Sequence, residues 1–131
     1  MTRILIVDDE ELIGMVLESE FEDAGFDVVG VERRQQDAVG TAHRSNPDVA
    51  LVDHGLASGD GAQVALALDA LGVKVIIATG DLAKVRGVAS LVGFWCLPKP
   101  FDPAVALLAV RTRLVSTEMP VTLKALGCLV L

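Results

Sequence analysis

Acidic residues directly follow two apolar runs of this chain, and a hydroxyl and an ammonium group follow two later ones. Asp8 and Asp9 come after "ILIV", Asp53 ends "VALVD", and Thr79 and Lys99 follow the later runs. Three carboxylates that lie together repel one another unless a cation offsets their charge. Mg²⁺ is such a cation, because it binds one or two carboxylates and keeps several waters. These residue types therefore predict a magnesium site.

The same residue types would serve phosphoryl transfer to an aspartate. Such a reaction needs a carboxylate nucleophile, positive charge near the transferring group and a hydroxyl that binds one of its oxygens. Lys99 and a metal ion would supply the charge, and Thr79 the hydroxyl. Asp53 is the best candidate nucleophile because it stands alone at the end of its run, before a loop rich in glycine. Asp8 and Asp9 are then better placed to hold the metal.

Short apolar runs alternate with longer amphipathic stretches along the chain, which predicts alternating strands and helices. The predicted strands span 3–8, 26–31, 49–53, 74–80 and 94–97. The predicted helices span 10–25, 36–45, 62–71, 82–91 and 104–115. Such alternation, with strands of nearly continuous Val, Ile and Leu, is typical of an α/β fold with a doubly wound five-stranded parallel sheet and helices on both faces. The polar residues then gather at the carboxyl ends of the strands, where such sheets place their active crevice.

The first and last predicted helices carry recognisable boundary signals. The first has its large apolar residues on one helical face: Leu12, Ile13, Val16, Leu17 and Phe21. Gly25 should close that helix, and Asp102 should cap the last one. Glu10 and Glu11 can be explained as acidic residues that the helix dipole favours at an N-terminus.

Composition limits the class of protein. The 131 residues fit one domain, and 52% of them are hydrophobic, with a mean hydropathy of +0.53. A net charge of -7 argues against direct binding of nucleic acid, which relies on clustered Lys and Arg. No apolar run approaches the roughly 20 residues of a membrane span, and no signal-peptide pattern is present. We therefore expect a cytoplasmic protein without membrane contact.

The two cysteines, Cys96 and Cys128, show no spacing typical of a zinc or redox site. Free cysteine is among the residue types most often found inside proteins. Both are therefore predicted to be buried small hydrophobic residues.

Four motifs, "ILIVDDEE", "DVALVD", "VIIATG" and "LPKPFD", occur in this order and at spacings that resemble the receiver domain of two-component response regulators. The resemblance covers about residues 3 to 115. It implies the flavodoxin-like strand order 2-1-3-4-5. It makes Asp53 the phosphoacceptor, Thr79 the switch hydroxyl and Lys99 the partner of the phosphoryl group.

The resemblance also implies the surroundings of that site. Asp9 would be the main Mg²⁺ ligand with Asp8 beside it, and Asp53 and the backbone carbonyl of Gly55 would complete the protein ligands. The Lys99–Pro100 peptide bond would be cis. Pro98 would be tolerated because the fifth strand would be an edge strand, where a missing N–H need not break a ladder.

The chain departs from the family where an aromatic switch residue is usual, three positions before the lysine. Cys96 stands there, with Trp95 beside it. The coupled switch is therefore absent or carried by another group, and Trp95 is the obvious substitute, although packing is the commoner role of such an aromatic.

Residues 116–131, "STEMPVTLKALGCLVL", lie beyond the receiver pattern of residues 1–115. The segment is too apolar for a free solvated tail. It should therefore pack on the domain, on a second copy or on a partner.

The predicted function is that of a phosphorylation-controlled binding module. By resemblance, a histidine kinase or histidine phosphotransfer protein would phosphorylate Asp53, and the face formed by the fourth helix, fifth strand and fifth helix would bind an unknown output protein. That face or the C-terminal extension could also form a homodimer. The domain would catalyse only its own phosphorylation and dephosphorylation.

Two other functions are weighed against this one. Cys96 and the apolar tail raise the alternative of a phosphate-independent interaction module that keeps the acidic pocket. A metal-dependent phosphatase would want Asp-x-Asp after the first strand, which "VDDEE" lacks.

Overall fold

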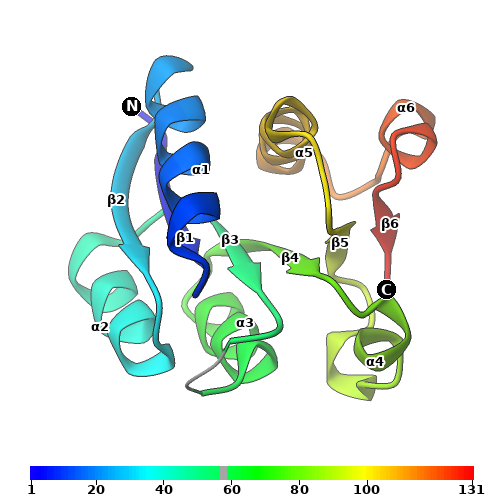
Figure 1. Cartoon of the computed structure of the whole chain (residues 1–131), viewed down its shortest axis with the longest axis horizontal. Helices are drawn as coiled ribbons and strands as arrows, with labels where there is room; N and C mark the ends of the chain where they lie inside the picture. The colour runs from blue at the N-terminus through cyan, green and yellow to red at the C-terminus, as the bar shows by residue number, and fades with distance from the viewer. Residues whose placement is uncertain (57–58) are drawn as a thin grey trace.

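The computed structural model describes residues 1–56 and 59–131, and in them a single sheet carries helices on both faces (Figure 1). Its strands are β1 (Arg3–Val7), β2 (Asp27–Glu32), β3 (Val49–Asp53), β4 (Lys74–Thr79), β5 (Trp95–Pro98) and β6 (Leu129–Val130). The strand order is β2-β1-β3-β4-β5-β6, with the first five strands parallel and β6 antiparallel to β5. The predicted α/β class and the order 2-1-3-4-5 are confirmed, with one strand added.

The helices alternate with the strands as predicted, apart from the region after β4. They are α1 (Glu11–Asp23), α2 (Gln35–Ser45), α3 (Gly61–Ala70), α4 (Leu82–Arg86), α5 (Pro103–Val115) and α6 (Val121–Ala125), with a 3-10 turn at Ala89–Leu91. The helix expected over 82–91 is thus two pieces, because Gly87, a poor helix former, ends α4. Part of the loop predicted at 54–61, residues 57 and 58, lies outside the described residues. No described helix is both long and apolar enough for a membrane span.

Two apolar cores lie on opposite faces of the sheet. Figure 1 shows the helices that cover these two faces. One joins α1, α5 and α6 to the side chains of Ile4 and Ile6, and the other joins α2, α3 and α4 to Leu5 and Val7. Successive side chains of a strand point to opposite faces, so a strand covered on both sides must be apolar at every position. This explains why the central strands β1, β3 and β4 are continuous apolar runs that could be predicted from the sequence.

Helix α1 divides its apolar residues between the core and the surface. Leu17 and Phe21 are fully buried, whereas Leu12 is 76% and Val16 52% exposed. The face predicted from the sequence is therefore wider than the part that packs on the sheet.

The C-terminal segment packs on its own domain. Met119 and Leu123 are buried in the same core as Trp95, and β6 pairs with β5. Of the three alternatives for residues 116–131, the structure shows packing on the domain itself.

The expectation that β5 is an edge strand is wrong, because β6 covers it. Pro98 is tolerated for a more local reason. The Lys99 N–H donates to the Thr79 carbonyl of β4, so by alternation the nitrogen of Pro98 faces the other side, where β6 pairs only with Trp95 and Cys96.

Both cysteines are buried, as predicted. Burial, together with the nearby Cys128, raises the pKa of the Cys96 thiol to about 11.

Gly61, the first residue of α3, lies against the backbone that carries Asp53. A Cβ at this position would lie 2.3 Å from the Asp53 carbonyl oxygen and 2.5 Å from the Cα of His54. Asp60 caps the helix by accepting a hydrogen bond from the Ala62 N–H. The start of α3 is therefore fixed directly on the end of β3.

Replacing Gly61 with Ala should destabilise the fold by about 1–3 kcal/mol, because the backbone of β3 or α3 must shift to admit the methyl group. Gly40→Ala is the matched control, since a Cβ there meets only the guanidinium of Arg44. Urea unfolding followed by circular dichroism measures both. Equal stability of the two variants would contradict this account of the contact.

Candidate functional site

Four polar side chains meet at the carboxyl ends of the parallel strands. Asp8 follows β1, Asp53 ends β3, Thr79 ends β4 and Lys99 follows β5. Asp8, Asp53 and Thr79 are at most 5% exposed. The sequence predicted all four for this edge, and the topology brings them together there.

Asp8 is held by backbone and side-chain contacts at the end of β1. Its N–H donates to the Glu32 carbonyl (3.0 Å), which continues the ladder with β2. Its Oδ1 accepts from the Glu10 N–H (2.9 Å), and its Oδ2 accepts from Lys99 Nζ (3.1 Å). The carboxylate is therefore fixed with one oxygen toward the lysine.

Lys99 is the positive centre of the site. Its Nζ lies 3.1 Å from Asp8 Oδ2, 3.2 Å from Asp53 Oδ2 and 3.3 Å from Glu10 Oε1. Its backbone N–H donates to the Thr79 carbonyl (2.7 Å), which fixes the start of the loop to β4. The Lys99–Pro100 bond that follows is cis, as expected from the resemblance.

Asp53 and Thr79 are each tied to the loop that follows them. Asp53 Oδ1 accepts from the Gly55 N–H (3.1 Å), and its Oδ2 faces Lys99. Thr79 Oγ1 accepts from the Asp81 N–H (2.9 Å). Thr79 follows Ala78, the residue paired with Asp53 across the sheet, so hydroxyl and carboxylate lie on neighbouring strand ends.

The charges of the site perturb one another. Burial, reinforced by the negative charge of Asp53, raises the pKa of Asp8 above its ordinary value, against the opposing effects of the Glu10 N–H and Lys99. Burial alone would lower the pKa of Lys99, but the hydrogen bond to Asp8 and the charges of Asp53 and Asp8 outweigh it and raise that pKa. Three carboxylates thus share one ammonium group, and negative charge is left over.

The donor atoms fit a hard divalent cation. Asp8, Glu10 and Asp53 each offer a carboxylate oxygen, and these oxygens lie within 4.8 Å of one another. An all-oxygen set of this kind is what Mg²⁺ prefers. Two of these residues, Asp8 and Asp53, were predicted as ligands, and Glu10 was not. The other two predicted ligands, Asp9 and the Gly55 carbonyl, stay predictions.

Glu10 was assigned to the helix N-terminus in the sequence analysis. It occupies the N-cap position of α1, but its side chain makes no capping hydrogen bond and lies against Lys99 instead. The sequence signal that could have placed Glu10 in the acidic cluster is its position two residues after Asp8 in an acidic run.

Trp95 and Cys96 lie on opposite faces of β5. Trp95 packs in the core of α1, α5 and α6 with Leu97, so by alternation Cys96 faces α4. The Arg113 guanidinium lies 5.8 Å from the centroid of the Trp95 ring. Trp95 therefore does not occupy the space that a side chain at position 96 would fill.

An apolar groove of about 580 Å³ opens beside Lys99, between α1 and the loop that leads into α5. Its walls include Leu12, Ile13, Val16, Pro100, Phe101 and Pro103. The exposed apolar residues of α1 thus lie next to the acidic cluster.

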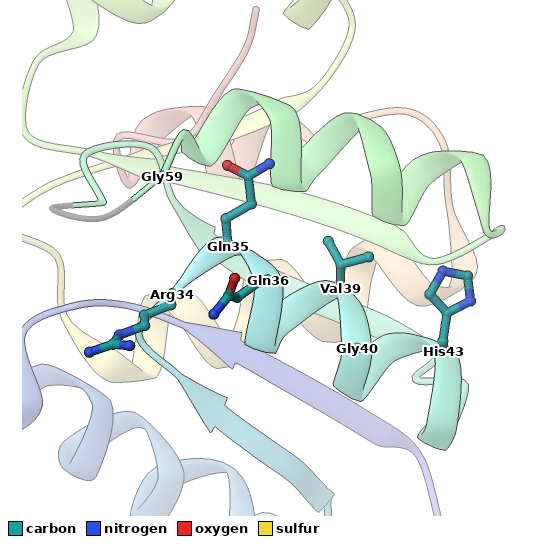
Figure 2. A pocket seen from close by; sticks show the side chains of 7 residues that line it. All are labelled: Arg34, Gln35, Gln36, Val39, Gly40, His43 and Gly59. Atoms are coloured by element: carbon teal, nitrogen blue, oxygen red, sulfur yellow. The ribbon is translucent and has the colours of Figure 1, made fainter.

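A second hollow, of about 790 Å³, lies on α2 and faces α3 (Figure 2). Gln35 and Val39 point toward α3, and Arg34 points away from it (Figure 2). The Gln35 side chain accepts from the Asp60 N–H (3.0 Å), so it serves to join α2 to the start of α3. The described residues that line this hollow include no carboxylate, which separates it from the acidic cluster.

The model of the response regulator receiver domain family matches residues 4–111 of the chain. The phyllosphere-induced regulator PhyR of Methylorubrum extorquens is 36% identical over 106 residues, which cover 79% of this chain and 40% of that protein. The chain spans about two fifths of the length of the curated relatives it matches.

Solved structures of receiver domains share the fold. The signal receiver domain of a modulated diguanylate cyclase from Desulfovibrio desulfuricans G20 superposes with a TM-score of 0.77 at 28% identity, covering 89% of this chain and 96% of that one. The receiver domain of PhyR from Erythrobacter litoralis gives a TM-score of 0.74 at 25% identity, covering 91% and 94%.

Replacing Asp8 with Asn should stabilise the metal-free protein and abolish its stabilisation by Mg²⁺. The fold raises the pKa of this carboxyl, so the ionised form lowers the free energy of unfolding. That free energy should therefore rise as pH falls through the pKa of Asp8. Mg²⁺ needs the ionised form, so Mg²⁺-dependent stabilisation of the wild type should fade over the same fall in pH. Thermal unfolding with and without excess Mg²⁺ measures both effects.

Glu11→Gln is the control for this experiment, because Glu11 lies in the same acidic run but outside the cluster. If Mg²⁺ stabilised the Asp8→Asn and Glu11→Gln proteins equally, Asp8 would not be a ligand of the metal.

Proposed function

Because the chain belongs to the response regulator receiver domain family, we propose that Asp53 accepts a phosphoryl group from a histidine kinase or a histidine phosphotransfer protein. The observation that carries the proposal is the position of the Asp53 carboxylate. It is buried at a strand end, 3.2 Å from Lys99 Nζ, within a group of oxygens suited to Mg²⁺.

The residues of the site have separate roles in this transfer. An Asp53 oxygen forms a bond to phosphorus while the bond from phosphorus to the donor's imidazole nitrogen breaks, and the imidazole leaves neutral after it gains a proton from solvent. Lys99 pairs with a phosphoryl oxygen, and Thr79 donates its hydroxyl hydrogen to another. The acidic residues of the site would hold a Mg²⁺ ion, which would supply charge neutralisation at the transferring group. The chain acts on itself and turns over no separate substrate.

We assign the metal to Asp8, Asp9, Asp53 and the carbonyl of Gly55, as the family resemblance implies. The proximity of Asp8 to Asp53 supports this set. Glu10 is 60% exposed and paired with Lys99, so it serves as a partner of the lysine before phosphorylation.

A phosphate-independent interaction module is the second candidate function. The observation that favours it is Cys96, a small buried side chain where the family carries an aromatic switch. Trp95 lies on the other face of β5, so the substitute considered for that switch packs elsewhere. Beryllofluoride, which mimics the phosphoryl group, distinguishes the two functions, since only a phosphorylation switch predicts a changed affinity for the output partner.

Incubation with a small phosphodonor and Mg²⁺ should add one phosphoryl group to the wild type and none to Asp53→Asn. The reason is that Asp53 supplies the nucleophilic oxygen and Asn does not. Intact-mass spectrometry measures the adduct. Absence of an adduct in folded wild type that binds both Mg²⁺ and beryllofluoride would contradict the proposal.

Asp9→Asn and Glu10→Gln form a matched pair for the same reaction. The assigned ligands predict a larger loss of the Mg²⁺-dependent adduct in Asp9→Asn. A larger loss of the adduct in Glu10→Gln than in Asp9→Asn would make Glu10, and not Asp9, the metal ligand.

The groove beside Lys99 is the proposed contact surface for the donor protein. The donor's phosphohistidine must come within bonding distance of Asp53, so the donor must cover the surface around the site. Leu12 and Val16 supply exposed apolar area there, of the kind that dominates protein interfaces.

Leu12→Asp and Val16→Asp should each slow transfer from a phosphorylated histidine protein that labels the wild type, by about tenfold. Labelling by the small phosphodonor should not change, because the site itself is intact. Val92→Asp is the control, since Val92 is 73% exposed and outside the groove. If Val92→Asp slowed transfer from the histidine protein by the same factor, the groove would not be the contact surface of the donor.

A further inference from the structure

Helix α2 carries positive charge in a protein that is acidic as a whole. Residues 33–45 hold three arginines and one acidic residue, Asp37, whereas the whole chain has a net charge of -7. The hollow of about 790 Å³ lies along this helix, with Arg34 and His43 at its two ends (Figure 2). No carboxylate is among the described residues that line it. The hollow is therefore suited to a ligand with negative charge.

A hydrogen-bond donor lies between these two ends. Gln35 Oε1 accepts from the Asp60 N–H, and Figure 2 shows the amide nitrogen of Gln35 turned toward the His43 end of the hollow. Asp60 uses its own carboxylate to cap α3, and Asp37 lies outside the lining. The Gln35 amide thus adds a positioned N–H donor to the two basic side chains.

Gly40 keeps the middle of the hollow open beside Val39. It is not one of the glycines with a positive φ, so its backbone does not require glycine. A Cβ there would lie 3.1 Å from a guanidinium nitrogen of Arg44, which is the far end of a flexible side chain. Glycine inside a helix costs roughly 1 kcal/mol relative to alanine. Packing within the domain does not explain this glycine, whereas close approach of another molecule does.

The dimensions and walls of the hollow fit a helix. Arg34 and His43 are nine residues apart in the sequence. At the α-helical rise this is about 13 Å along α2, or between two and three turns of a partner helix. The described lining comes from the α2 region and from Gly59, before α3, so it offers no strand edge. An extended segment would leave backbone groups without partners there, whereas a helix pairs its own.

We propose that this hollow binds an acidic amphipathic helix of a partner protein. Carboxylates of that helix would pair with Arg34 and His43, and its apolar side chains would contact Val39 and the open backbone at Gly40. Amphipathic helices bind grooves of other proteins in this way. Helices α1 and α2 pack on opposite faces of the sheet, so this surface is separate from the groove beside Lys99. The inference does not depend on phosphorylation of the protein.

The test presents the full chain to two phage-displayed libraries of helical peptides of about four turns. One library carries glutamate on the polar face and the other carries lysine at the same positions, and both vary the apolar face. Peptides from the glutamate library should be enriched. Their affinity, measured by fluorescence anisotropy, should fall as the salt concentration rises, because salt screens exposed charges.

Gly40→Leu should weaken binding of the enriched peptides by at least about tenfold, because the leucine side chain fills the middle of the hollow. The variant should fold and be at least as stable as the wild type, since leucine is a better helix former than glycine. Thermal unfolding checks this stability. Ala70→Leu is the matched control, because Ala70 is an exposed helix position outside the hollow.

Arg34→Glu should weaken the same peptides several-fold, because it places like charges together. Lys84→Glu is the control, since Lys84 is an exposed basic residue on α4, outside the hollow. Enrichment of the lysine library, or of neither library, would overturn the proposal. Equal affinity for the wild type and Gly40→Leu would also overturn it, because the peptides would then bind elsewhere. A dimer of the wild type that Gly40→Leu abolishes would assign the hollow to a second copy of the chain instead.

Discussion

The buried ammonium group of Lys99 makes the acidic end of this sheet possible. Asp8 and Asp53 are almost fully buried, and two carboxylates at one strand edge repel each other unless a positive charge lies beside them. Lys99 contacts both, while its own backbone N–H bonds the end of β4. The same residue therefore balances charge between β1 and β3 and fixes the loop after β5. Any change that moves β5 along the sheet also changes the electrostatics at Asp53.

Much of the site was predictable because parallel strands end at one edge. Strands β1, β3 and β4 are apolar at successive positions, since the two cores cover both of their faces. Once these strands are placed, the polar residues that end them must converge. Asp8, Asp53 and Thr79 follow from this argument, and Lys99 joins them from the end of the neighbouring strand β5. Their chemical roles came from the family resemblance, which adds information that spacing lacks.

What the sequence did not predict depends on contacts between distant segments. β6 is two residues long, too short for any periodic signal, and it exists because the tail meets the open edge of β5. The orientation of Glu10 depends on Lys99, 89 residues away in the chain. Leu12 and Val16 share the apolar face of α1 with Leu17, but they stay exposed and line the groove beside Lys99. Tertiary context decides each of these cases.

Cys96 has a chemical consequence beyond its small size. A thiol reacts with oxidants and electrophiles as the thiolate, and a pKa of about 11 leaves roughly one molecule in ten thousand ionised near neutral pH. The side chain is also 1% exposed. The position that holds an aromatic ring in many receiver domains is thus occupied by a cysteine that the fold makes redox-silent, and oxidative stress should leave β5 unmodified while the domain stays folded.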